Sequence, residues 1–468
     1  MATSTQGRVP TAMSVKLRLL VLAVTVLASL AIVPTASAAV AYRGVQLHSL
    51  WSSSSDESMA RELDLVRDLG ANAVRADIAW SSLQTDGPNG YSDWYVEKLD
   101  AFVAGAEARG MKVIANMWST PCWASSAPET LKQGCEGAWW DRGVTKHMPR
   151  NPLDYARTAQ WLTARYGTKL AALEVWNEPN HENFLTAPDA AAAYAPLVKA
   201  TYPLAKAGNP DVPVLAGALS FADRDFLVRL YALGIKGSYD GISVHPYNEW
   251  RAPGDMWENE WKRYTLIPGL RSIRAAQQAV GDNTPVWITE FGWTNCNAGS
   301  DRWCVTSEKQ ASYLRDSFGL IDAEPYVKSA VVYNLRDKGT DRNDPEDNFG
   351  LMTRDYTPKP AYAAVRAAWT GDRSVATPAP QRTGGSVLKV RVVVQGGTAY
   401  VQGRAPARAI VQLRVSRCQG KCTPRHRVRA SRGGKFRRRL GPVRQVRGAR
   451  VEARVPGKRV AAPVGRRS

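Results

Sequence analysis

Between residues 42 and 369 short apolar runs alternate with longer stretches of helical periodicity, and this alternation constrains the fold more than any other feature. The stretches Trp94–Arg109, Leu153–Arg165, Ala187–Ala207 and Ser307–Ile321 repeat apolar residues along one helix face. The apolar runs are Gly44–Leu47, Ala73–Ile78, Met111–Ala115, Ala172–Val175, Val212–Leu215, Gly241–Val244, Pro285–Thr289 and Ser329–Val332. Eight strands that alternate with helices predict an α/β fold in which parallel βα units close into a (β/α)8 TIM barrel.

A doubly wound open sheet is the alternative that the same alternation allows. Nothing that resembles a glycine-rich phosphate-binding loop follows the first predicted strand, which counts against this alternative. Long Pro-, Gly- and Trp-rich segments at Met117–Asn151 and Asn248–Pro268 follow predicted strands. In a barrel such loops open on the face where active sites lie.

Tryptophans are concentrated near the predicted strand ends. All 16 precede residue 372, and the 12 at or just after strand ends are Trp51, Trp80, Trp118, Trp123, Trp139, Trp140, Trp176, Trp250, Trp257, Trp261, Trp293 and Trp303. Flat apolar rings with one polar N–H suit the apolar face of a sugar. We expect about half of them to face a cleft and the others to pack the loops.

The positive charge of the chain is confined to its C-terminal part. Residues 373–468 hold 25 of the 62 Lys and Arg residues but one acid, Glu452, so residues 1–372 carry 37 basic and 41 acidic residues. We therefore divide the chain into a catalytic domain at 39–372, a Pro/Gly/Ser/Thr-rich linker at 373–386 and a basic accessory domain at 387–468. Alternating apolar and basic residues predict a small β-sandwich there, and a disordered basic tail is the alternative.

The first 38 residues have the composition of a secretory signal peptide. Lys16 and Arg18 precede the apolar run Leu19–Val33, and the small-residue triplet Ala36-Ser37-Ala38 follows it. Cleavage near Ala38 would leave a secreted, extracellular protein with no transmembrane anchor, and association with the cell wall is a further expectation. A retained membrane anchor is the alternative, but the run is short for a span of ~20 residues.

Six cysteines suit such an oxidising compartment. They lie in three close pairs, and we expect disulfides within the pairs Cys122 and Cys135, Cys296 and Cys304, and Cys418 and Cys422. Six cysteines allow 15 pairings, so proximity gives only a preference. A zinc site is the competing interpretation. The sequence contains no CxxC or HExxH motif, and we expect neither a metal nor another cofactor.

Two glutamates end otherwise apolar strands and are the candidate catalytic residues. Glu178 follows the fourth predicted strand in Leu173–Asn180 (LEVWNEPN), and Glu290 ends the seventh in Val286–Trp293 (VWITEFGW). A carboxylate at such a position is costly unless it faces a functional cavity. Enzymes that cleave glycosidic bonds use two carboxyl groups, one on each side of the bond.

These motifs resemble the signatures of clan A glycoside hydrolases. WNEPN and ITEFGW are accompanied by VRADIAW (Val74–Trp80), SVHPY (Ser243–Tyr247) and EDNFGLM…KPAY (Glu346–Tyr362). Together they are most similar to glycoside hydrolase family 39, with family 5 second. The resemblance covers roughly residues 42–370. It implies a retaining glycosidase with Glu178 as acid/base and Glu290 as nucleophile.

The same resemblance implies roles for other residues. Asn177 would bind the sugar 2-hydroxyl, Arg75 would lie under Glu290 and keep it ionised, Tyr247 would bond to Glu290, and His245 would line the subsite next to the scissile bond. Positions at other strand ends add His48, Asn116, Trp118 and Tyr333 as candidates for sugar contact. The family usually has an aromatic residue, often Trp, at the end of strand eight, where this chain has Val331–Asp337 (VVYNLRD).

The sequence thus predicts a secreted retaining β-glycosidase that acts on an oligo- or polysaccharide. The basic C-terminal domain adds an expected affinity for an anionic cell-surface polymer, with no specific nucleic acid as a partner. Two other function classes remain open: a glycan-binding pseudoenzyme, and a wall-attached interaction protein that uses the basic domain. An arginine-rich composition that reflects only coding bias is the alternative explanation for the charge.

Overall fold

The computed structural model describes two compact units of the chain. The first comprises residues 40–51, 54–255, 264–297 and 301–372, and the second 388–395, 398–405, 410–416, 425–431, 435–442, 449–455 and 458–463. The predicted signal peptide, the linker, and the Cys418 and Cys422 pair lie outside the described residues. Within the described ranges, no helix has the length and hydrophobicity required to cross a bilayer.

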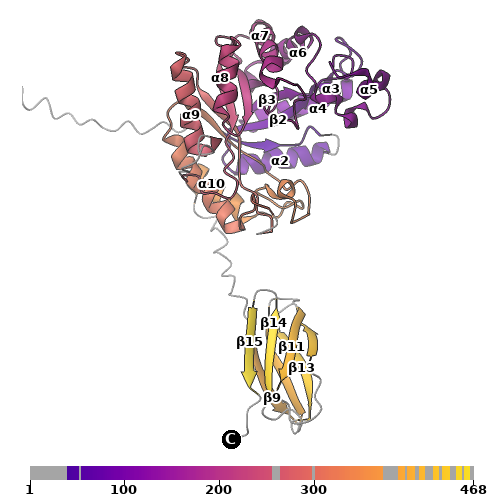
Figure 1. The fold of residues 1–468 in the computed structure, drawn as a ribbon, viewed down its shortest axis with the longest axis vertical. Helices are drawn as coiled ribbons and strands as arrows, with labels where there is room; N and C mark the ends of the chain where they lie inside the picture. Colours follow the sequence, from indigo (N-terminus) through magenta and orange to yellow (C-terminus); the bar gives the residue numbers. More distant parts are fainter. Residues whose placement is uncertain are drawn as a thin grey trace, which may run out of the picture. The chain divides into compact units, whose positions relative to one another are not determined.

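Eight parallel strands form a closed barrel in the first unit, each hydrogen-bonded to its sequence neighbours and β8 to β1 (Figure 1). The strands are β1 (Tyr42–Leu47), β2 (Ala73–Ala79), β3 (Lys112–Trp118), β4 (Leu170–Val175), β5 (Val214–Ser220), β6 (Gly241–His245), β7 (Val286–Phe291) and β8 (Val327–Val332). The predicted TIM barrel is therefore confirmed. Observed β3 and β5 extend three and five residues beyond their predicted ends.

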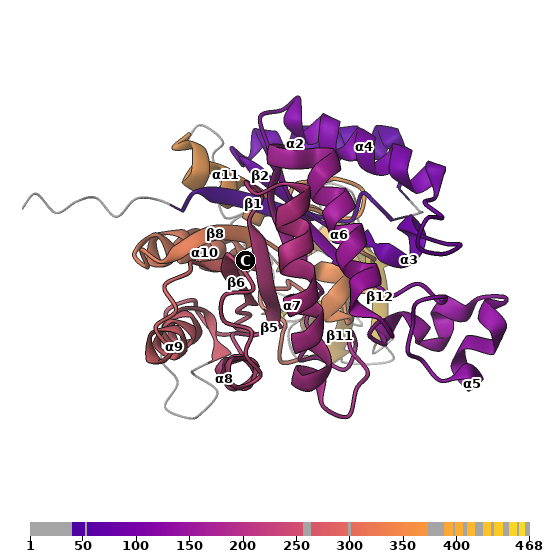
Figure 2. The ribbon, with the colours of Figure 1, turned by 90° about the horizontal axis from the view of Figure 1, so that it is seen from above.

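Helices surround the barrel strands, as Figure 2 shows. They are α2 (Asp56–Asp68), α3 (Trp80–Leu83), α4 (Asp93–Glu107), α5 (Glu129–Lys132), α6 (Pro152–Tyr166), α7 (Ala190–Gly208), α8 (Arg224–Ala232), α9 (Leu266–Ala279), α10 (Ser307–Asp322) and α11 (Pro360–Thr370). Side-chain caps begin several of them; Ser55, for example, accepts a hydrogen bond from the Ser58 N–H and so satisfies a free donor of α2.

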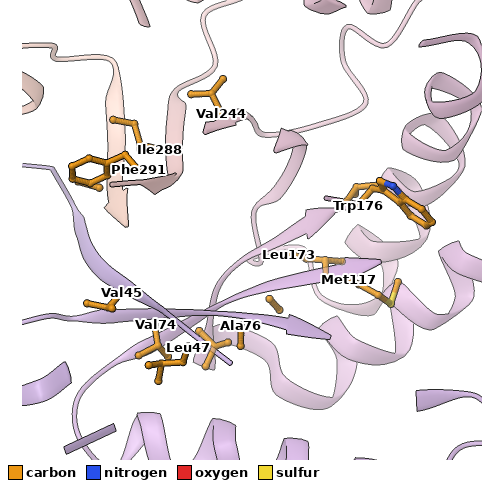
Figure 3. Close-up of a cluster of buried hydrophobic side chains, with 14 of the residues drawn as sticks. Val45, Leu47, Val74, Ala76, Met117, Leu173, Trp176, Val244, Ile288 and Phe291 are labelled. Atoms are coloured by element: carbon orange, nitrogen blue, oxygen red, sulfur yellow. The ribbon is translucent and has the colours of Figure 1, made fainter. Parts of the chain in front are cut away.

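Strand alternation separates the outer core of the barrel from its interior. Val74 and Ala76 of β2 belong to the large apolar cluster shared with the helices, part of which Figure 3 shows. The side chain of the intervening Arg75 points into the barrel, where it donates hydrogen bonds to Gln46 of β1 and Glu174 of β4. A smaller buried apolar cluster contains Ile114, Ala171, Ala172, Leu215, Trp287 and Val331, and the partly buried Tyr42 packs against it.

Seven antiparallel strands form two sheets in the second unit, in agreement with the predicted β-sandwich. One sheet has the order β13-β10-β9 and the other β12-β11-β14-β15. Their bounds are β9 (Lys389–Gln395), β10 (Thr398–Arg404), β11 (Ile410–Ser416), β12 (Arg425–Arg429), β13 (Lys435–Pro442), β14 (Arg450–Val455) and β15 (Lys458–Pro463). Alternate residues such as Val401, Val411, Leu413 and Val451 form its buried core, while the intervening arginines are exposed.

Candidate active site

A cavity of about 400 Å³ lies at the carboxyl ends of the barrel strands. Its lining includes residues in or just after all eight strands: His48 and Trp51 after β1, Asp77 in β2, Trp118 in β3, Asn177 and Glu178 after β4, Ser220 in β5, Tyr247 after β6, Glu290 in β7, and Tyr333 after β8. The loops contribute His181, Asn183, Phe184, Phe221, Trp303, Lys338, Glu346 and Phe349. Both predicted catalytic glutamates therefore face one cavity.

Glu178 is positioned by an unusual turn after β4. Trp176 and Glu178 both have left-handed backbone conformations, with φ of 69° and 40°. Such conformations cost of order 1–3 kcal/mol for residues other than glycine. The turn is held by its neighbours: the Trp176 N–H donates to the Met117 carbonyl of β3, and the Glu178 N–H donates to the Ala218 carbonyl of β5. The strained backbone directs the Glu178 side chain into the cavity.

Glu290 accepts one strong hydrogen bond on each carboxylate oxygen. Arg75 donates from Nη1 to Oε1 at 2.6 Å, and the Tyr247 hydroxyl donates to Oε2 at 2.6 Å. Gly292 lets the adjacent backbone approach closely, because a Cβ there would lie 2.4 Å from the Tyr333 carbonyl oxygen. Glu290 is therefore fixed by donors that favour its ionised form.

Arg75 is fully buried and joins the other inward-facing polar groups of the barrel. Its Nε donates to Glu174 Oε2 at 2.8 Å, Nη1 also donates to Gln46 Oε1 at 2.9 Å, and Nη2 donates to Asn177 Oδ1 at 2.9 Å. Burial opposes its charge, but Glu174 and Glu290 raise the Arg75 pKa above its ordinary value. The planar guanidinium thus orients a glutamate and an asparagine of the cavity at once.

His245 contacts both glutamates from beneath the cavity. Its Nδ1 lies 2.9 Å from Glu178 Oε1 and 3.7 Å from Glu290 Oε2. The ring is fully buried, and burial lowers its pKa, so it is neutral at neutral pH. His245 is predicted to line the subsite next to the scissile bond, but it is not among the residues that line the cavity. It orients the Glu178 carboxyl group instead.

The two carboxyl groups stand close to one another. One oxygen of Glu178 and one oxygen of Glu290 lie within 4.8 Å, together with a nitrogen of His245. Retaining glycosidases separate their carboxyl groups by about 5–5.5 Å and inverting ones by about 6.5–9.5 Å. A cation would fit the same three ligands by distance, but the Arg75 guanidinium already neutralises Glu290. The spacing is that of a retaining pair.

Burial raises the pKa of both carboxyl groups, that of Glu290 to about 7 despite the lowering effects of Arg75 and Tyr247. The pKa of Glu178 is raised by burial and, beyond that, by the charge of Glu290. Two carboxylates this close share a proton over a wide pH range. Because both oxygens of Glu290 already accept hydrogen bonds, the shared proton belongs on Glu178. This is the protonation state that an acid and a nucleophile require.

Asn177 lines the cavity and is oriented from behind by two donors. Its Oδ1 accepts from Arg75 Nη2 and from Asn116 Nδ2 at 3.0 Å, so its amide N–H groups are the end available to a ligand. Asn116 is fully buried and does not line the cavity. The structure therefore places Asn116 beneath the cavity, behind Asn177, and the predicted contact of Asn116 with sugar stays a prediction. Asn116 lies one layer deeper because β3 continues past it to Trp118.

The other predicted contact residues line the cavity. His48 packs against Trp51 with ring centroids 4.2 Å apart, Trp118 is half-buried against Phe184, and Tyr333 packs edge-on against Tyr247. Tyr333 thus occupies the strand-eight position where an aromatic residue is expected. These three residues form apolar walls around the two carboxyl groups.

Some of the tryptophans near strand ends line the cavity and others do not. Of the 12 near strand ends, Trp51, Trp118 and Trp303 line it, whereas Trp80, Trp176 and Trp293 are buried in the core. Trp257 and Trp261 lie outside the described residues. Three of the ten described tryptophans near strand ends therefore line the cavity, and the expected half of all twelve stays a prediction.

Sequence reasoning missed the residues that support the site. Glu174 of β4 and Gln46 of β1 are fully buried partners of Arg75, and Asp77 of β2 accepts from Asn116. Although burial opposes it, Arg75 lowers the pKa of Glu174, which therefore stays ionised. The sequence did hold one signal for Glu174, because this residue places a charge inside the otherwise apolar run Leu170–Val175.

Two of the three predicted disulfides are confirmed. Cys122–Cys135 fixes the segment between β3 and α6, and Cys296–Cys304 closes the segment between β7 and α10. The second bond adjoins Trp303, whose ring packs 6.0 Å from that of Tyr247 in the cavity wall. It therefore constrains one side of the candidate active site.

Comparison with known proteins identifies a family of glycoside hydrolases. The sequence profile of the family described as Cellulase (glycosyl hydrolase family 5) matches residues 33–320. A curated β-glucosidase from Agrobacterium sp. is 31% identical over 118 residues. That match covers 25% of this chain and 23% of the β-glucosidase, so the two share only a segment of their lengths.

Solved structures share the backbone of this chain at low sequence identity. A family 39 glycoside hydrolase from Bacteroides cellulosilyticus WH2 has a TM-score of 0.56 at 18% identity, with 87% of this chain and 81% of that chain covered. A family 39 β-xylosidase from Caulobacter crescentus has a TM-score of 0.51 at 19% identity, with coverage of 81% and 82%. At these identities the likeness shows the fold.

Proposed function

The chain belongs to the cellulase family (glycosyl hydrolase family 5), whose members are retaining glycoside hydrolases of clan A, and we propose that it hydrolyses β-linked oligo- or polysaccharides by double displacement. The observation that carries this proposal is the approach of Glu178 and Glu290 to within 4.8 Å in a cavity at the carboxyl ends of the strands. The β-linkage is supported by the β-glucosidase and β-xylosidase among the similar proteins.

In the first step a carboxylate oxygen of Glu290 attacks the anomeric carbon and the bond to the leaving oxygen breaks. Glu178 donates its proton to that oxygen, so the aglycone departs as an alcohol and a glycosyl ester of Glu290 remains. Arg75 and Tyr247 hold the attacking carboxylate in place through their hydrogen bonds. Asn177 presents its amide N–H groups to the 2-hydroxyl of the sugar that reacts with Glu290.

In the second step Glu178, now ionised, removes a proton from water, which attacks the same carbon and displaces Glu290. The sugar is released with retained configuration, and both glutamates return to their initial states. His245 accommodates both states of Glu178, because a neutral imidazole Nδ1 donates to the carboxylate in one tautomer and accepts from the carboxylic acid in the other.

Stereochemistry tests the two assigned roles separately. Glu290→Ala and Glu178→Ala would each be incubated with azide and 2,4-dinitrophenyl β-glycosides of glucose, xylose and mannose. We expect Glu290→Ala to give the α-glycosyl azide by direct displacement and Glu178→Ala to give the β-glycosyl azide through the glycosyl-enzyme. The wild type should release the β-anomer first by proton NMR. A first-formed α-anomer would contradict the nucleophile assignment.

The proposal includes secretion. Its support is the signal-like composition of residues 1–38 together with the two disulfides, which form where the compartment is oxidising. N-terminal sequencing of protein from culture medium should find a start near Ala39. A full-length chain retained in the cell would contradict secretion. The pseudoenzyme alternative predicts glycan binding without turnover on every substrate of the panel.

A further inference from the structure

The sheet of β9, β10 and β13 in the second unit contains a groove of about 680 Å³. Strand register places its lining residues in rows that cross all three strands. One wall is Lys389, Arg404 and Lys435, and the other is Arg391, Gln402 and Arg437. The floor between them is the row Val390, Gly403 and Phe436.

The glycine in the floor is required by close approach of the backbone. A Cβ at Gly403 would lie 1.9 Å from the Lys389 carbonyl oxygen and 3.0 Å from the Phe436 ring. Wall residues on one strand are two positions apart, which separates the walls by about 7 Å, and three strands give the groove a length of about 10 Å. These dimensions admit a single extended polymer chain.

The groove is cationic and its charge is not neutralised by acids within the unit. The single acid of residues 373–468 is Glu452, which lies on β14 of the other sheet. The groove arginines are held by neutral groups instead: Arg437 donates from Nη2 to Gln395 Oε1 at 2.6 Å and lies 4.2 Å from the Tyr400 ring centroid. With its amide oxygen turned toward Arg391, Gln402 accepts from Nη2 at 2.8 Å.

Like charges placed across neighbouring strands destabilise a sheet. Arg404 is flanked in register by Lys389 on one side and Lys435 on the other. All three side chains are exposed, and so are Arg391 and Arg437. An anion in the groove would relieve this repulsion, and the two pre-oriented arginines offer planar forks that match carboxylates.

The shape distinguishes among polyanions. A duplex is read by elements that project into its grooves, whereas this site is a recess in a sheet. Single-stranded nucleic acid is bound by stacking on exposed aromatic rings. Among the lining residues the aromatic one is Phe436, whose side chain is 5% exposed. A polymer with charges but without bases fits these features.

We propose that the groove across β9, β10 and β13 binds a single chain of a carboxylated polysaccharide, a polyuronate. This binding site lies outside the candidate active site and goes beyond the proposed hydrolysis. The groove is then the specific site at which the expected binding of anionic polymers occurs. Because binding is measured without turnover, its failure is separate from failure of the catalytic proposal.

Isothermal titration of the full chain with oligogalacturonate tests the site. In the groove variant, Arg391→Gln, Arg404→Gln and Arg437→Gln are combined. The matched control combines Arg425→Gln, Arg427→Gln and Arg429→Gln, which removes three exposed charges from β12 of the other sheet. We expect the dissociation constant to rise at least about tenfold in the groove variant and less than about twofold in the control.

Activity on an aryl β-glycoside should remain unchanged in both variants, which shows that the barrel is intact. Equal loss of binding in the two variants would overturn the proposal in favour of diffuse attraction by net charge. Polyphosphate or single-stranded DNA of matched charge that binds through the groove as tightly as oligogalacturonate would overturn the assignment to a polysaccharide. Absence of binding by the wild type at low salt would also overturn it.

Discussion

Arg75 donates to Glu290 across the barrel interior at 2.6 Å, and the guanidinium that does so has no exposed surface. A buried cation in contact with one of two adjacent carboxyl groups makes them unequal. Glu290 keeps its charge, and the proton shared by the pair goes to Glu178. The difference in protonation state between two chemically identical side chains thus originates in Arg75 of β2, a strand that contributes neither glutamate.

Replacement of Arg75 should therefore impair the nucleophile specifically. In Arg75→Gln we expect kcat/KM to fall by about 10³-fold or more, because a buried charge that stabilises the reacting carboxylate is lost. The acid limb of the pH–rate profile should also move to higher pH, since Arg75 lowers the pKa of Glu290. The measurement is kcat/KM on an aryl glycoside between pH 4 and 8.

Two further variants keep this prediction decisive if Arg75→Gln folds poorly. Arg75→Lys retains the charge but cannot reach Glu174, Gln46 and Asn177 together. Its acid limb should therefore move less than that of Arg75→Gln, while its kcat still falls. Arg43→Gln removes the ion pair with Asp322 near the opposite end of the barrel and should leave the profile unchanged. An acid limb that stays in place in Arg75→Gln would contradict the assigned role.

Tyr247 provides the second hydrogen bond to Glu290, and its removal can be compared with that of a neighbouring tyrosine. Tyr247→Phe should lower kcat by about 10–100-fold and shift the acid limb upward, because the hydroxyl lowers the pKa of Glu290. Tyr333→Phe is the matched control, since Tyr333 packs edge-on against Tyr247 in the same cavity. If both variants shift the limb equally, the effect comes from packing and not from the hydrogen bond.

The barrel and its candidate catalytic pair could be predicted from the sequence because both depend on local patterns. Apolar runs alternate with helical periodicity from Gly44 to Val332, and each glutamate ends a run inside a recognisable motif. The predicted membership of clan A is confirmed, with a family 5 sequence profile and a backbone similar to family 39 structures. Neither conclusion requires knowledge of a long-range contact.

The depth of a side chain inside the barrel could not be predicted in this way. Alternation shows that Asn116 faces inward, but only the register of β3 against β4 shows that it lies beneath Asn177. The partnership of Arg75 with Glu174 joins residues 99 positions apart and has no local signature. Whether a loop tryptophan lines the cavity or is buried in the core depends on packing between loops, which sequence periodicity does not indicate.

The Cys296–Cys304 disulfide should support the active site more than the Cys122–Cys135 disulfide does. Its removal by paired Cys→Ala substitutions frees the segment that places Trp303 against Tyr247, so we expect KM to rise severalfold with a smaller change in kcat. The Cys122–Cys135 disulfide closes a longer loop, so the corresponding Cys122→Ala, Cys135→Ala variant should lower Tm at least as much. Equal changes in KM for the two variants would contradict a specific role for Trp303.

His48 should make the stability of the barrel depend on pH in a predictable direction. Burial, aided by the charges of Lys338, Arg75 and Arg336, lowers its pKa to about 3. The unfolded chain takes up a proton near pH 6.5, whereas the folded protein does not. Stability is therefore fully present above pH 6.5 and decreases as the pH falls toward 3, by about 2 kcal/mol at pH 5.

His48→Gln removes this group and should flatten the fall in Tm between pH 7 and pH 5 relative to the wild type. His181→Gln is the control for loss of an imidazole that lines the same cavity. Thermal unfolding of the three proteins at several pH values is the measurement. The lowered pKa predicts that the difference between the curves of wild type and His48→Gln is constant above pH 6.5 and shifts against the wild type as the pH falls below 6.5. Parallel curves over the whole range would show that His48 titrates in the folded state as it does in the unfolded chain.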